Sequence, residues 1–166
     1  MARRGDSNQG GDVLFGLEIH PSVVHFPIAL TIVGALFSVL YVFTKKDWMR
    51  WFAPLLLSLA LAGAVTAYFT GQAASDRAEK IGVPDKAIEE HEESGLWALG
   101  TIAVACLLGW ATHARRKGTW VAMILALLAA SVVARTAHLG GQLVYVHGAG
   151  RVQGAPGVAG QKPDGD

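Results

Sequence analysis

The chain has 166 residues, of which 52% are hydrophobic and 16% are charged, and its mean hydropathy is +0.36. A soluble domain carries about 25% charged residues, so this composition disfavours a soluble domain and favours a membrane protein. The net charge of +1 gives no support for nucleic-acid binding. The single cysteine, Cys106, excludes an internal disulfide and any paired-cysteine metal or haem-attachment motif, and we expect it to be a small packing residue.

Four long apolar blocks dominate the chain between a polar N-terminal tail, residues 1–19, and a Gly/Pro-rich C-terminal tail, residues 149–166. No cleavable signal is evident at the start. The blocks cover residues 22–44, 49–73, 95–113 and 119–139. Each is close to the roughly 20 residues that cross the hydrocarbon of a bilayer as a helix, and none alternates like a barrel strand. The sequence therefore predicts an all-α fold, an integral membrane four-helix bundle in residues 20–148.

The charges of the connections predict the orientation of this bundle. Two short connections, residues 44–50 and 113–118, are basic, whereas the longer loop 76–93 is rich in Asp and Glu and is broken by Gly82-Val83-Pro84. Short basic loops stay in the cytoplasm. We therefore expect a bacterial inner-membrane protein with the acidic loop and both termini outside.

Tryptophans support the same orientation. Trp48, Trp51, Trp110 and Trp120 flank the two basic connections, and Trp97 stands near the start of the third block. Tryptophan is enriched where a membrane helix meets the headgroups. The four tryptophans beside the basic connections would then mark the cytoplasmic boundary of the membrane, and Trp97 would mark the outer boundary.

Histidines gather at one predicted face of the membrane. Only His113 falls on the inner side, and the other five fall on the outer side: His20, His25, His91, His138 and His147. A histidine in or near a membrane span is costly and indicates a function. Neutral imidazole binds zinc, copper and iron, and haem iron takes one or two axial histidines, often inside a four-helix bundle.

The first helix offers two candidate ligands. His20 and His25 are five residues apart and point about 140° from each other on a regular helix. If Ala29 and Ile32 face the bundle interior, so does His25. We therefore expect His25 to be a ligand before His20, which would lie at the rim.

The partner of His25 is expected on another helix, at His91 or His138. Arg135, one turn before His138, could face a haem propionate, and Gln72 could add a hydrogen bond at the same level. Small residues below these ligands would leave room for a haem, although such residues also serve ordinary helix contacts. They follow helical spacing in the second and third blocks, at Ala60, Gly63, Ala67, Gly71, Ala74, Gly95, Ala98, Ala105 and Gly109.

Two end motifs resemble those of a family of small bacterial membrane proteins classed as a domain of unknown function. They are the segment 20–30, HPSVVHFPIAL, and the segment 138–148, HLGGQLVYVHG. The resemblance covers residues 20–150, and some relatives are joined to Rieske or cytochrome modules, which implies electron transfer and a b-type haem. The family pattern matches at His20, His25, Gly71, His91, His138, Gly140, Gly141 and His147.

The closing motif also has a physical interpretation. Gly140-Gly141 could end the fourth helix, because glycine adopts the left-handed conformation of a helix cap. The chain could then return His147 to the mouth of the bundle.

The leading hypothesis is a membrane-anchored, b-type cytochrome-like electron-transfer subunit rather than a stand-alone enzyme. It would bind haem b and sit in the lipid bilayer, with other membrane or periplasmic electron-transfer proteins, or quinone, as partners. One alternative is a zinc- or copper-binding protein that uses the acidic loop or histidines. The metal ligands would come from His25, His91, His138 and His147. The other alternative to a cytochrome is a cofactor-free structural subunit of a membrane complex.

Overall fold

Four long helices form the chain in a computed structural model that describes residues 9–115 and 117–149. Within these residues every regular element is helical, which confirms the predicted all-α fold. The elements are α1 (Gln9–Thr44), the short 3₁₀ helix η1 (Asp47–Trp51), α2 (Phe52–Lys80), α3 (Asp85–Arg115) and α4 (Thr119–Tyr145).

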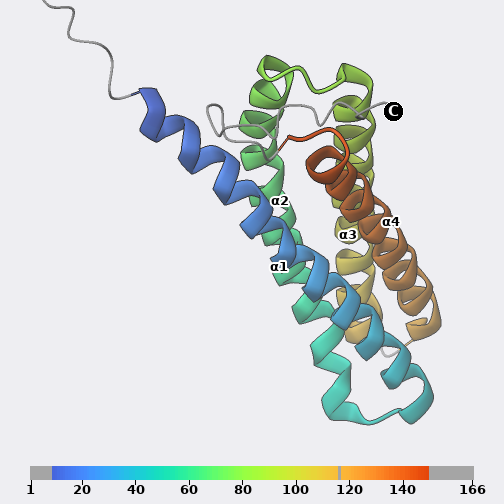
Figure 1. Cartoon of the computed structure of the whole chain (residues 1–166). Coiled ribbons are helices and arrows are strands. Elements are labelled where there is room, and N and C mark those ends of the chain that lie inside the picture. The colour runs from blue at the N-terminus through green and yellow to red at the C-terminus, as the bar shows by residue number, and fades with distance from the viewer. Residues whose placement is uncertain (1–8, 116, 150–166) are drawn as a thin grey trace, which may run out of the picture.

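The helices run up and down and pack in chain order (Figure 1). α1 crosses α2, α4 crosses α3, and the bundle closes through contacts of α2 with α3 and of α1 with α4. α1 and α3 therefore occupy opposite corners. The α2–α3 connection, the start of α1 and the end of α4 lie at one end of the bundle, which we call the histidine end. The η1 segment and the α3–α4 connection form the other end, the basic end.

Each of the four helices contains a segment long and apolar enough to cross a membrane, within Ile19–Thr44, Asp47–Lys80, Asp85–Thr112 and Thr119–Tyr145. Large apolar side chains lie on the outside of the bundle, including Phe69 at 65% and Leu107 at 68% exposure. In water such a surface would be unfavourable, whereas lipid solvates it. The outside of the bundle is therefore a lipid-facing surface.

Small side chains fill the middle of the bundle. Ala60, Ala105, Ala126 and Ala129 are fully buried, and they form one core with larger residues such as Ile102. Membrane helices lack a hydrophobic drive toward one another and associate through close packing of small residues. The predicted small stripes are thus used in helix contacts: a Cβ on Gly63 would lie 3.1 Å from Pro27, and one on Gly109 would lie 3.5 Å from Pro54.

The helices extend beyond the apolar blocks. α1 already begins at Gln9, within the predicted tail. α2 continues to Lys80 and α3 begins at Asp85, so most of the predicted acidic loop is helical and only residues 81–84 form the turn. Gly82 has a left-handed φ of 85° there, as the predicted break requires. Hydropathy marks the part of a helix that lies in lipid, but backbone hydrogen bonding continues past it.

The predicted end of the fourth helix is wrong. α4 passes through Gly140-Gly141 and ends at Tyr145. The glycine with the left-handed conformation is Gly148, with a φ of 73°. Gly140 has a different role, because its missing side chain makes room for a histidine ring.

Candidate functional site

Two histidines from opposite corners meet at the histidine end of the bundle. His20 comes from α1 and His91 from α3, and their ring centroids are 6.5 Å apart with planes at 85°. Both side chains are half-buried. Since α1 and α3 are not neighbours, this contact spans the interior of the bundle.

Each ring rests on a glycine of the next helix along the chain. A Cβ on Gly71 of α2 would lie 3.1 Å from Cε1 of His20, and a Cβ on Gly140 of α4 would lie 3.1 Å from Cε1 of His91. Such distances are too short for ordinary carbon contacts, which begin near 3.5 Å. A side chain at either glycine would therefore push the ring by a few tenths of an ångström. The two helical hairpins, α1–α2 and α3–α4, thus repeat one local arrangement.

The hydrogen bonds around His20 favour one tautomer of its ring. Nδ1 of His20 lies 3.1 Å from the hydroxyl oxygen of Thr70. That hydroxyl points its proton at the carbonyls of its own helix, at Thr66 and Ala67, each 3.1 Å away. With that proton on a carbonyl, the Thr70 oxygen is free to accept from an Nδ1–H of His20. Nε2 of the neutral ring is then the nitrogen that carries the free lone pair.

The surroundings of His91 leave one nitrogen without a partner. Nδ1 of His91 is buried and has no hydrogen-bond partner among the described residues. Next to the ring, the hydroxyls of Ser94 and Thr136 bond to each other at 2.7 Å, and the Thr136 hydroxyl donates to the Ser94 carbonyl at 2.9 Å. An unsatisfied buried polar atom costs about 1–3 kcal/mol. In this layer, Nδ1 of His91 is thus the ring nitrogen for which the described residues supply no partner.

The expected inward orientation of His25 is wrong, and His20 is the histidine of α1 that faces the interior. Ala29 and Ile32 are exposed, and so is His25, whose Nδ1 hydrogen-bonds to the carbonyl of Pro21 on its own helix. The inward face of α1 instead continues from His20 through these buried residues: Pro27, Thr31, Gly34, Ala35 and Ser38. Large apolar residues face lipid here, so the face with the small and hydroxyl-bearing residues is the inner one.

The other predicted site residues lie outside this pair. His138 is exposed and its Nε2 lies 3.2 Å from Nε2 of Gln142, while Arg135 is also exposed on α4. Gln72 is exposed and donates to the Tyr68 hydroxyl at 3.1 Å. His147 follows α4 with its side chain exposed. The side chain of the predicted inner histidine, His113, lies outside the described residues.

The predicted ligand residues are therefore brought together only in the pair of His20 and His91. Among the described residues no group of three or more His, Cys, Asp or Glu side chains is placed to hold a metal ion. His91 was predicted as an inward residue, whereas its contact with His20 was not. The signal that could have found it is spacing: His20, Pro27, Thr31, Gly34 and Ser38 follow one helical face.

Comparison with known protein families shows to which family the chain belongs. It belongs to a family of membrane proteins, described as "Predicted membrane protein (DUF2231)", whose model matches residues 16–153. No curated protein and no solved structure matches the chain. The matched region contains both halves of the histidine pair and both glycines.

Proposed function

We propose that this protein is a b-type cytochrome-like electron-transfer subunit in which His20 and His91 hold one haem. The observation that carries the proposal is the pair itself: two half-buried imidazoles from opposite corners, each resting on a glycine. A porphyrin already gives iron four ligands, so a haem protein needs at most two axial side chains. A zinc site needs three or four protein ligands.

The separation of the rings agrees with shared axial ligation. A metal–imidazole bond is about 2 Å long. Two such bonds, with half a ring at each end, place the centroids roughly 6–7 Å apart. The observed separation is 6.5 Å. The rings therefore stand at a distance at which one iron could contact both.

The polar atoms also fit a haem site. His20 presents Nε2 because its Nδ1–H is held by Thr70, and a second hydrogen bond of this kind commonly fixes the orientation of a metal-bound histidine. His91 has a buried nitrogen that still lacks a partner. When bound, haem supplies a one-electron iron couple. Gly71 and Gly140 leave space for the rings.

The position of the pair suggests how electrons would enter and leave. His20 lies at the start of one apolar span and His91 near the start of another, so the pair is close to one membrane surface. Loop charge favours the outer surface of a bacterial inner membrane for this end. A relay there would exchange electrons with other membrane or periplasmic proteins, or with quinone in the lipid.

Absorption spectra of the oxidised and reduced protein, purified after expression with ample haem, test the proposal. We expect a Soret band and sharp reduced bands, and we expect His91→Ala to remove the low-spin form. His138→Ala is the matched control, because His138 is exposed on the neighbouring helix, and it should keep the wild-type spectrum.

Other outcomes would support the alternatives. Wild-type protein without a Soret band contradicts the haem proposal. Zinc or copper bound at one equivalent, and lost in His91→Ala, would then favour a metal-binding protein. Loss of stability without any bound cofactor would favour a structural subunit.

A further inference from the structure

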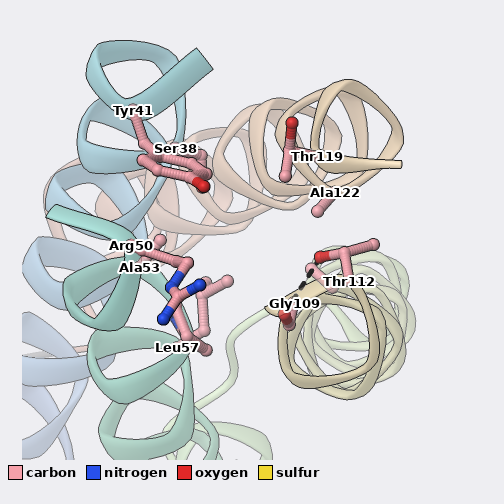
Figure 2. Close-up of a pocket in the computed structure, with 11 residues that line it drawn as sticks. Ser38, Tyr41, Arg50, Ala53, Leu57, Gly109, Thr112, Thr119 and Ala122 are labelled. Atoms are coloured by element: carbon pink, nitrogen blue, oxygen red, sulfur yellow. Dashed lines mark hydrogen bonds between the residues drawn. The ribbon is translucent and has the colours of Figure 1, made fainter. Parts of the chain in front are cut away.

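A partly open cavity lies at the basic end of the bundle, far along the helices from the histidine pair. It has a volume of about 30 Å³ and is lined from all four helices and η1. Figure 2 shows Arg50 and Tyr41 on one side of it and Thr112 and Thr119 on the other. A water-sized group needs about 10–15 Å³ by this measure, so the cavity takes about two such groups.

Arg50 lines this cavity and carries an unsatisfied donor. Its Nε is buried and has no hydrogen-bond partner among the described residues. Its guanidinium carbon lies 5.5 Å from the centroid of the Trp51 ring, which places the planar cation beside an aromatic side chain. A guanidinium donates and never accepts. The missing partner is therefore an acceptor, and an anion would also balance the charge.

The rest of the lining adds donors and positive potential. Tyr41 and Thr119, which carry hydroxyls, line the cavity. Lys45 is not part of the lining, but its ammonium lies 5.8 Å from the centroid of the Tyr41 ring. α4 begins at Thr119 without a side-chain cap, after Gly118 in the left-handed conformation. The first amides of a helix carry partial positive charge. These groups all favour an anion over a neutral ligand.

The level of the cavity in the membrane indicates which anion is at hand. Tyr41 and Thr112 stand at or near the ends of two apolar spans, whereas Arg50 and Thr119 stand at or near the starts of the other two. The cavity therefore lies where the helices leave the hydrocarbon. Phosphate groups of lipids occupy this level, and arginine binds phosphate through its fork of donors.

We propose that this cavity binds the phosphate group of an anionic phospholipid, with Arg50 as the principal ligand. Two non-bridging phosphate oxygens correspond to the two water-sized groups that the cavity accommodates. Tyr41 and Thr119 donate to the same oxygens, while the acyl chains of the lipid continue along the apolar surface of the bundle. The inference stands independently of haem binding.

The retention of lipid by the full chain tests directly whether the cavity binds a phospholipid. The protein is reconstituted in nanodiscs of phosphatidylcholine with or without phosphatidylglycerol, and bound lipid is counted by native mass spectrometry. We expect phosphatidylglycerol to be retained by the wild type and to bind roughly tenfold more weakly to Arg50→Gln, since a charge-assisted bond is lost. Lys46→Gln is the matched control, because Lys46 is an exposed cation in the same connection.

A second arm separates lipid from free phosphate. Inorganic phosphate is titrated into the phosphatidylcholine discs, and the unfolding temperature is recorded. Stabilisation that requires Arg50 would support the phosphate site and assign it to a soluble anion. If Arg50→Gln does not fold, Tyr41→Phe and Thr119→Val replace it and should each weaken retention. Equal retention and equal stabilisation in these variants and in Lys46→Gln would overturn the proposal.

Discussion

The two ends of the bundle present opposite kinds of polar group. At the histidine end, His20 and His91 offer ring nitrogens with lone pairs. At the basic end, Arg50 offers donors alone, in a cavity edged by hydroxyls. Between them the core is closely packed and built largely from alanine and glycine.

This difference shows how one simple fold can present two kinds of polar group at its two ends. Lone pairs suit a metal cation, whereas a guanidinium suits a phosphate. The packed middle separates the two groups, so a change at one end should leave the other unaffected. The predictions below break or sharpen this contrast, starting with the largest expected effect.

The glycines beneath the histidine rings should be the most sensitive positions. Gly71→Ala and Gly140→Ala would each put a methyl group 3.1 Å from a ring carbon. The ring must shift, so we expect haem occupancy, read from the Soret band, to fall by at least roughly tenfold. The two variants should behave alike, because the two hairpins share one arrangement.

Gly141→Ala provides the control for these variants. It lies in the same helix as Gly140, and a Cβ there meets no atom within 4 Å. Alanine in a helix gains about 1 kcal/mol over glycine, so Gly141→Ala should stabilise the protein and keep its spectrum. If Gly141→Ala loses as much haem as Gly140→Ala does, the contact between Gly140 and the His91 ring is not what matters for haem binding.

Loss of the hydrogen bond between His20 and Thr70 should have a smaller effect on haem binding. Thr70→Val keeps the shape of the side chain and removes the acceptor at 3.1 Å. We expect haem binding to weaken by about tenfold, the lower end of the effect of losing such a partner, and the reduction potential should change as well. Haem titration and a potentiometric titration measure both, with Thr66→Val as control, because the Thr66 hydroxyl bonds to its own helix.

Substitutions in the packed middle of the bundle should have the smallest effect. They should lower the free energy of unfolding slightly and leave the absorption spectrum unchanged. Ile102 is 1% exposed and Ile124 is 50% exposed. Ile102→Val removes one methyl group from the core and should cost about 0.5–1.5 kcal/mol of unfolding free energy. Ile124→Val, at the lipid surface, should cost less. If a denaturation series gives the two variants equal losses of unfolding free energy, the core around Ile102 is not more tightly packed than the lipid surface.

Much of the fold follows from the sequence because lipid imposes strict rules. The four apolar blocks predict four helices, and Gly82 predicts the turn between α2 and α3. Helix ends were less predictable, since polar residues such as those before Lys80 continue a helix into water without an apolar signal. Gly140 looked like a helix cap because its contact with His91 is invisible in the local sequence.

The candidate site was half predictable for a related reason. His91 was predicted to face inward, and it does. His25 was preferred to His20 because apolar Ile32 was assumed to be internal, as in a soluble protein. In lipid the rule reverses, and Thr31 and Ser38 mark the inner face. Whether iron binds there is a matter of chemistry that a helical pattern does not encode.

Low-temperature electron paramagnetic resonance of the oxidised, haem-loaded protein tests the central claim most directly. The account predicts one low-spin ferric haem per chain with two histidine ligands and a strongly anisotropic signal, because the His20 and His91 rings stand at 85° to each other. His20→Ala and His91→Ala should each convert it to a high-spin signal, and His25→Ala should not. A low-spin signal that survives both substitutions would contradict the account.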